Sequence, residues 1–263
     1  MIESVQNLEV KRLLKLRRAR IRRSEGLFIV EGQREIQVGL GTGVAFEQVF
    51  FCRTFLSDRE QGGILSRLRE CGVPLVEMAQ APFQKISLRQ NPDGLFALAP
   101  TWKLNVEDLT LGDPPVVLLM DGVEKPGNLG AVLRSAEAFG VDAVVCVDPN
   151  LDLFNPNVVR ASQGLFFRVP TVICGRDTIT DFLRLRELRI FATSAKAVKS
   201  AWEIDFCGAT ALVMGSEAHG LDPYWLEVAD ERIAIPMQGE ADSLNLSVAT
   251  GCLLAEIYRQ RTR

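Results

Sequence analysis

The fold class of this chain is decided by the stretch Val116-Val-Leu-Leu-Met-Asp-Gly-Val-Glu-Lys-Pro-Gly-Asn-Leu-Gly-Ala-Val-Leu-Arg-Ser-Ala-Glu-Ala-Phe139. Its first five residues are apolar on both faces of a strand, which is expected when helices cover a parallel sheet on each side. The segment 126–128 then opens a helix, because apolar residues recur after it at helical spacing. A buried strand that leads into an amphipathic helix is typical of a doubly wound α/β fold.

The same alternation continues outward in both directions. Strands are predicted at 116–120, 142–147, 167–173, 189–193, 210–214 and 232–235, and helices at 129–139, 156–162, 177–187 and 246–260. The first hundred residues alternate over shorter runs, which predicts a smaller α/β unit. Between them, residues 101–115 are polar and contain Gly112-Asp-Pro-Pro. We therefore predict two domains, 1–100 and 116–263, joined by a linker at 101–115.

Composition limits the kinds of chemistry. The chain has 263 residues, of which 47% are hydrophobic and 24% charged, as in ordinary globular proteins. No apolar run approaches the roughly 18 residues that cross a bilayer, so a cytoplasmic protein without a membrane segment is expected. The six cysteines are far apart, and His219 is the only histidine. A zinc site or a histidine-based triad is therefore improbable, and we predict no metal.

Positive charge is concentrated near the N-terminus, although the net charge is −3. Residues 10–23 contain eight basic side chains and no acid: Lys11, Arg12, Lys15, Arg17, Arg18, Arg20, Arg22 and Arg23. Apolar residues alternate with these charges, so residues 3–24 are predicted to form one amphipathic helix. Nucleic acid is the leading partner for such a segment. A solvated helix face and a cleaved transit peptide are the two alternatives.

Three clusters carry the candidate chemistry. The turn after the strand at 116–120 lacks the G-x-G-x-x-G fingerprint of dinucleotide-binding proteins, but the helix start at Asn128 could hold an anion, with Arg134 as a second donor. The second cluster, Gly215-Ser-Glu-Ala-His-Gly-Leu221, follows the strand at 210–214. The third runs from Ile235 to Asn245, where Ser243 is predicted to cap the last helix. Each alone is more often an ordinary turn or loop.

Together the clusters are specific. Asn128-x5-Arg134, Gly215-x-Glu217-x-x-Gly220 and the segment 236–245 followed by Ser247-Val-Ala resemble the three motifs of the SpoU/TrmH family of RNA ribose 2'-O-methyltransferases, in the SPOUT superfamily. Lys11-Arg-Leu-Leu-Lys-Leu and Phe28-Ile-Val-Glu-Gly resemble the N-terminal substrate-binding domain of that family. The resemblance covers nearly the whole chain.

The resemblance implies a deep trefoil knot in the C-terminal parallel-sheet domain, a smaller N-terminal α/β domain that binds RNA, and a homodimer formed by the C-terminal domain. It implies S-adenosyl-L-methionine as cofactor. The implied cofactor-binding residues are Gly215, Glu217, Gly220, Ile235, Met237 and Leu244. The implied catalytic residues are Asn128, Arg134, Glu217, Ser243 and Asn245. The expected RNA-binding residues are Lys11, Arg12, Lys15, Arg17, Arg18, Arg22 and Arg23.

The role of Arg134 has two interpretations. The family's proposed base falls on this residue, but a guanidinium stays protonated above pH ~12. We favour a role in which Arg134 holds the phosphate beside the target ribose, while Asn128 and Ser243 orient the hydroxyl. Positioning should dominate, since a sulfonium already activates its methyl group.

Ribosomal RNA is the preferred substrate, because the appended domain resembles that of family members acting on large-subunit RNA, and transfer RNA is the alternative. A catalytically silent RNA-binding protein is the rival from another class, and a nicotinamide-dependent enzyme would need the glycine fingerprint that is missing. Lys125, Ser216 and the segment Gln90-Asn-Pro-Asp-Gly94 depart from the family pattern. These departures leave the substrate less well defined than the reaction.

Overall fold

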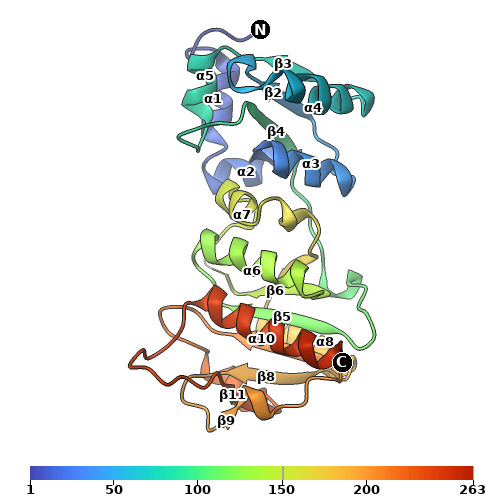
Figure 1. Ribbon diagram of the computed structural model, residues 1–263, viewed down its shortest axis with the longest axis vertical. Coiled ribbons are helices and arrows are strands. Elements are labelled where there is room, and N and C mark those ends of the chain that lie inside the picture. The colour runs from blue at the N-terminus through green and yellow to red at the C-terminus, as the bar shows by residue number, and fades with distance from the viewer. Residues whose placement is uncertain (150, 263) are drawn as a thin grey trace. The chain divides into compact units, whose positions relative to one another are not determined.

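Two units make up the chain in the computed structural model, which describes residues 1–149 and 151–262 and, within 58–62, the backbone only (Figure 1). The first unit comprises Met1–Trp102 and Asp152–Arg168, and the second comprises Lys103–Leu151 and Val169–Arg263. The first boundary falls inside the predicted linker. The segment 152–168, which the sequence prediction assigned to the C-terminal domain, packs with the N-terminal unit instead.

The first unit contains a four-stranded sheet in the order β1-β4-β2-β3. Its strands are β1 (Leu27–Glu31), β2 (Gln48–Phe51), β3 (Leu75–Glu77) and β4 (Leu95–Pro100). β4 is antiparallel to both β1 and β2, and β2 is parallel to β3. The helices of this unit are α1 (Leu8–Lys15), α2 (Ala19–Glu25), α3 (Gln33–Gly41), α4 (Asp58–Glu70), α5 (Gln80–Ile86) and α7 (Pro156–Ala161), with short 3-10 turns at Arg53–Phe55 and Leu165–Phe167.

The predicted single helix over 3–24 is wrong, because the structure has two helices in that region. α1 ends at Lys15, Arg18 is extended (φ −93°, ψ 127°), and α2 begins at Ala19. Val10, Leu13 and Leu16 are fully buried in the core of this unit. The break directs the second helix to a different surface, where it buries Arg22 rather than an apolar residue.

The segment 152–168 is fixed to the first unit by aromatic contacts. The ring of Phe154 lies 5.0 Å from Phe28 of β1 and 4.8 Å from Trp102, measured between centroids. Gly164 passes so close to α3 that an added Cβ would lie 2.9 Å from the Cα of Glu35. This packing explains why the segment belongs to the N-terminal unit.

The second unit is built on a seven-stranded sheet in the order β7-β6-β5-β10-β8-β11-β9, in which every pair of neighbours is parallel. Its strands are β5 (Val116–Asp121), β6 (Ala143–Val147), β7 (Thr171–Cys174), β8 (Arg189–Thr193), β9 (Lys199–Ser200), β10 (Thr210–Met214) and β11 (Glu231–Ala234). The helices are α6 (Pro126–Ala138), α8 (Arg176–Leu185), α9 (Pro223–Val228) and α10 (Leu246–Arg261), with 3-10 turns at Val106–Asp108 and Ala201–Glu203. The predicted parallel α/β fold is confirmed.

Both faces of this sheet are covered. Val117 and Leu119 of β5 pack with Leu183 of α8 and Trp225 of α9 in one core cluster. Alternate residues of a strand point to opposite faces, so the other β5 side chains face the side on which α6 and α10 lie next to each other (Figure 1). The sequence prediction missed α9, although Asp222 before Pro223 is a typical helix start. Within the described residues, no helix has both the length and the apolar composition of a bilayer span.

Candidate active site

One cavity of about 420 Å³ lies in the second unit, at the carboxyl ends of β8, β10 and β11. Ligands of parallel α/β sheets bind at this edge. The cavity brings together two of the three predicted motifs, which are separate in sequence. The predicted site residues that line it are Gly215, Glu217, Gly220, Ile235, Met237, Ser243, Leu244 and Asn245.

The loop after β10 is a tight turn. The Ser216 and Gly220 backbones exchange two hydrogen bonds, with N···O distances of 2.9 and 3.0 Å. Gly220 has φ +71°, which favours glycine. At Gly215 an added Cβ would lie 2.3 Å from the carbonyl carbon of Gly220, so the turn leaves no room for a side chain there. The glycines of the second motif therefore shape the cavity wall.

The first predicted motif, Asn128-x5-Arg134, meets this turn through the side chain of Asn128. The Asn128 amide on α6 donates a hydrogen bond to Oε1 of Glu217, and the Asn245 amide lies 3.4 Å from Oδ1 of Asn128. The other carboxylate oxygen of Glu217, Oε2, is buried and has no hydrogen-bond partner among the described residues. A buried, unpaired carboxylate oxygen is costly and favours a cationic or hydrogen-bond-donating ligand.

The cap of the last helix differs from the prediction. Asn245, not Ser243, is the N-cap of α10, because its Oδ1 accepts hydrogen bonds from the Ser247 amide at 3.0 Å and from the Ser247 hydroxyl at 2.7 Å. Ser243 is exposed and lines the cavity. The correction leaves Ser243 available for a ligand and fixes the orientation of Asn245.

Arg134 is exposed on α6, six residues beyond Asn128. At 1.5 Å per residue, this spacing corresponds to about 9 Å along the helix axis. Arg134 does not line the cavity, and within residues 1–149 and 151–262 it has no carboxylate partner. An unpaired guanidinium outside the mouth of a cavity is suited to an anionic group of a large substrate.

Sequence reasoning missed part of the cavity wall. The missed lining residues include the last residue of β8, Thr193, with Ser194 and Ala195 directly after it. Met214 and Ile233 near the ends of β10 and β11 also line the cavity. The Ser194 amide donates to the Ile233 carbonyl at 2.9 Å, which joins two of these strand ends. The rule that ligands bind beyond the carboxyl ends of parallel strands would have found this segment from the predicted strand at 189–193.

The basic segment of the first unit is only partly available to a polyanion. Arg22 is 2% exposed and pairs with Asp152, so its predicted contact with RNA is wrong for this conformation. Arg17 donates to the carbonyls of residues 85–87 at 2.8 to 3.2 Å. Arg12 pairs with two glutamates. The predicted residues that remain exposed without such partners in the described part of the chain are Lys11, Lys15, Arg18 and Arg23.

The parallel sheet and the cavity at its carboxyl edge define an α/β ligand-binding domain. Residues 115–255 match the SpoU rRNA Methylase family, and residues 7–97 match the MRM3-like substrate binding domain. The chain therefore belongs to the SpoU rRNA methylase family. The sequence-based assignment to this family is confirmed.

Full-length relatives agree with this assignment. The chain is 29% identical to the 23S rRNA guanosine 2'-O-methyltransferase RlmP of Bacillus subtilis, over 96% of this chain and 97% of that protein. It superposes on a crystal structure described as an RNA 2'-O ribose methyltransferase with a TM-score of 0.89, at 37% identity, covering 100% and 99% of the two chains. The SpoU methyltransferase AviRb of Streptomyces viridochromogenes in complex with AdoMet gives a TM-score of 0.88 at 25% identity, covering 97% and 99%.

Proposed function

We propose that this protein transfers a methyl group from S-adenosyl-L-methionine to a ribose 2'-hydroxyl of ribosomal RNA. The observation that carries the proposal is the single cavity to which the segments 215–220 and 235–245 both contribute, linked to Asn128. RlmP, which is similar over nearly its whole length, is named as acting on 23S rRNA, and this supports ribosomal over transfer RNA.

The cavity residues fit the proposed cofactor. Ile233, Ile235 and Leu244 offer apolar surface to an adenine ring, and Gly215 lets the backbone approach a ligand closely. The unpaired Oε2 of Glu217 matches a ligand that carries positive charge and N–H groups. Bound there, the cofactor would supply an activated methyl group.

The side chains around the cavity mouth position the acceptor. Asn128 is held by Glu217 and Asn245, so its amide has a fixed orientation. Ser243 is free to hydrogen-bond a ribose hydroxyl, and Arg134 holds the neighbouring phosphate. Because a guanidinium is a poor proton acceptor, we assign Arg134 to positioning and charge neutralisation rather than to proton removal. Correct alignment of the 2'-oxygen is then the main contribution of the protein.

RNA docking and methyl transfer are assigned to different parts of the chain. Residues 1–100, with residues 152–168 packed on them, dock RNA, residues 101–115 link the two parts, and the remainder of residues 116–263 carries the transfer. The match of residues 7–97 to a substrate binding domain supports the first assignment. Because its substrate is ribosomal RNA, we place the protein in the cytoplasm.

The second unit is proposed to contain the deep trefoil knot of the resembled family and to form a homodimer. Membership of the family supports the knot. For the dimer, Val248 and Tyr258 of α10 are 51% and 48% exposed, so this helix offers apolar and aromatic side chains that a second copy could cover. Sedimentation of the full chain over a range of concentrations tests the dimer, and a monomer at all concentrations would contradict it.

One assay tests the reaction and the substrate together. The protein is incubated with methyl-labelled donor and with separate pools of unmodified ribosomal and transfer RNA, and alkali-resistant linkages are then mapped. Label in ribosomal RNA at a linkage that resists alkali is expected, because a 2'-O-methyl group blocks cleavage. Label in transfer RNA alone would show that the substrate is transfer RNA and not ribosomal RNA. Label in neither pool would favour a catalytically silent RNA-binding protein.

A further inference from the structure

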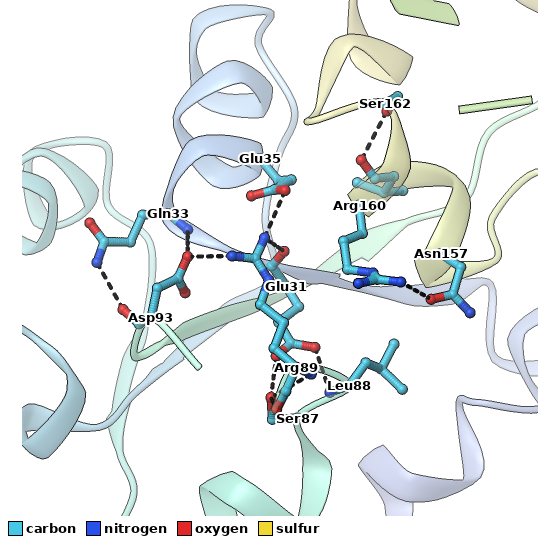
Figure 2. A network of polar contacts seen from close by, with 11 residues as sticks. Glu31, Gln33, Glu35, Ser87, Leu88, Arg89, Asp93, Asn157, Arg160 and Ser162 are labelled. Carbon is cyan, nitrogen blue, oxygen red and sulfur yellow. Dashed lines mark hydrogen bonds and ion pairs between the residues drawn. The ribbon is translucent and has the colours of Figure 1, made fainter. Parts of the chain in front are cut away.

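The turn of residues 87–93, between α5 and β4, is held in place by buried charged groups (Figure 2). Glu31 at the end of β1 is 5% exposed and accepts hydrogen bonds from the Leu88 amide at 2.7 Å and from the Ser87 hydroxyl. The same hydroxyl accepts from the Arg89 amide at 3.0 Å. The start of the turn is therefore anchored to the sheet.

Arg89 anchors the turn a second time. Its guanidinium donates to Glu35 of α3 at 2.8 Å and to Asp93 at 3.0 Å. Asp93 in turn accepts from the Gln33 amide at 3.0 Å. Gly32 makes room for this arrangement, since an added Cβ would lie 2.0 Å from Oε2 of Glu35. Phe28-Ile-Val-Glu-Gly32, one of the resemblance segments, thus supplies one anchor, Glu31, and the space for the other, Glu35, in a network that holds a turn more than fifty residues away in sequence.

The buried groups of this network cost free energy in the folded state. Burial raises the pKa of Glu35 above its ordinary value, despite the nearby guanidinium. Glu35 Oε2, Arg89 Nε and Asp93 Oδ1 are buried without hydrogen-bond partners in the described part of the chain. Buried ion pairs seldom add net stability compared with apolar packing. A network that fixes a turn without adding net stability is better explained by a function of the exposed side chains on that turn.

The turn presents two amides next to a cation. A cleft in the first unit is lined by Leu88, Arg89, Gln90, Asn91 and Arg160 of α7. Gln90 and Asn91 are exposed, and their side chains have no partner among the described residues. Arg160 is also exposed, and the one hydrogen bond of its guanidinium within the described residues goes to the neutral Asn157 amide oxygen at 3.3 Å (Figure 2). Its charge is therefore uncompensated by any described carboxylate.

The basic segment of residues 10–23 lies in the same unit as the cleft and contacts residues close in sequence to its lining. Arg17 from that segment donates to the Ser87 carbonyl at 3.1 Å, at the start of the turn. Arg22 pairs with Asp152, at the start of the chain segment that carries Arg160. Two arginines of the basic segment thus contact the two chain segments that contribute residues to the cleft, and the exposed cations of the basic segment lie in the same unit.

We infer that the turn of residues 87–93 and Arg160 form a contact site for an unpaired nucleotide of the RNA substrate, with a phosphate at Arg160 and the base edge at Gln90 and Asn91. This inference rests on the proposed function, since it names where the substrate RNA is held. Amide side chains both donate and accept, which suits the edge of an unstacked base, and a guanidinium suits a phosphate. The buried network fixes the backbone of the turn that carries the two amides, which limits where they can reach, and a preorganised support of this kind suits recognition of a base.

The test uses the full-length protein and an unmodified transcript of large-subunit ribosomal RNA. Arg160→Ala and the double variant Gln90→Ala/Asn91→Ala are compared with Arg160→Lys and with Arg69→Ala, which removes the same charge from an exposed position on α4 of the same unit. The measurements are RNA affinity at several salt concentrations, kcat and KM for methyl transfer, and donor binding by calorimetry.

We expect Arg160→Ala and the double variant to raise the Kd and the KM for RNA at least about fivefold, with kcat and donor affinity unchanged. Arg160→Ala should also reduce the salt dependence by about one phosphate contact, a loss that the double variant should not show and that Arg160→Lys should largely restore. If Arg160→Ala and the double variant bind RNA as tightly as Arg69→Ala does, while the wild type methylates the transcript, the contact site is overturned and the proposed function stands. A wild type that neither binds nor methylates the transcript would overturn the proposed function and this site with it.

Discussion

Arg22 donates two hydrogen bonds to Oδ2 of Asp152, from Nε at 3.0 Å and from Nη2 at 2.7 Å, and a third to the Leu16 carbonyl at 2.8 Å. The side chain of Arg22 is 2% exposed and that of Asp152 19%. A cation from the basic segment is thus used to fasten residues 152–168 to the first unit.

Removing the carboxylate of this pair should destabilise the protein. Asp152→Ala leaves the Arg22 charge buried without its partner, which costs roughly 3 kcal/mol in the free energy of unfolding. Urea denaturation measures the loss. Asp181→Ala, at an exposed position of α8, is the control and should change stability by less than about 0.5 kcal/mol. Equal stability of the two variants would show that the pair contributes nothing net.

The exposed cations of the basic segment should govern the salt dependence of RNA binding. Neutralising Lys15, Arg18 and Arg23 together is expected to weaken RNA binding and to flatten the plot of log affinity against log salt. A protein that makes fewer phosphate contacts releases fewer counterions when it binds. Arg22→Met serves as the comparison, since Arg22 is buried and should leave the slope as it is. An unchanged slope in the triple variant would mean that these cations form an ordinary solvated helix face and do not contact RNA phosphates.

Periodicity predicted the sheet well and the long-range contacts poorly. The strand at 116–120 and the helix at 129–139 correspond to β5 and α6, because both patterns are local and strong. The break between α1 and α2 was missed, since Leu16 and Ile21 prolong the apolar pattern across Arg18. The burial of Arg22 depends on Asp152, 130 residues away, and no local pattern carries that information.

The candidate site shows the same division. Glycines and a carboxylate after a strand pointed to the loop at Gly215 and Glu217, and that loop does line the cavity. The hydrogen bond from Asn128 to Glu217 was not predictable from spacing, because it depends on how the start of α6 meets the loop after β10, 89 residues away in sequence. The choice of Asn245 over Ser243 as helix cap was equally open, since both residue types are good caps.

Arg134 and Glu217 should affect different measurements. Arg134→Ala is expected to lower kcat for methyl transfer by a hundredfold or more, because positioning of the acceptor carries much of the rate. Donor affinity in the same variant should stay within about twofold, since Arg134 does not line the cavity. Glu217→Gln should instead weaken donor binding, measured by calorimetry. Full turnover by Arg134→Ala would contradict the assigned role.

Gly215 should tolerate no side chain. In Gly215→Ala the new Cβ would lie 2.3 Å from Gly220 C and 2.4 Å from Leu221 N, so the turn must open. We expect donor binding to fall at least about tenfold, because the cavity wall moves. Gly208→Ala is the matched control, as it lies in the same unit outside the cavity wall and no atom lies within 4 Å of a Cβ added there. Donor binding by Gly215→Ala equal to that of the control would show that the turn does not shape the cofactor site.

Cys146 should make the protein sensitive to alkali. Burial raises the pKa of its thiol from 9.0 to about 12, because the side chain lies on the buried strand β6, where water cannot solvate a thiolate. Above pH 9 the unfolded thiol loses its proton while the folded one keeps it. The stabilisation is therefore complete below pH 9 and is lost as the pH rises toward 12.

Between pH 8 and pH 10.5, this one group should cost about 2 kcal/mol of unfolding free energy. Lysines and tyrosines titrate in the same range, so the informative quantity is the difference between the wild type and Cys146→Ala at each pH. That difference should shrink by about the same amount on raising the pH, as measured by urea denaturation. A constant difference would mean that the thiol ionises equally easily in the folded and unfolded chains, and that β6 is open to water at this position.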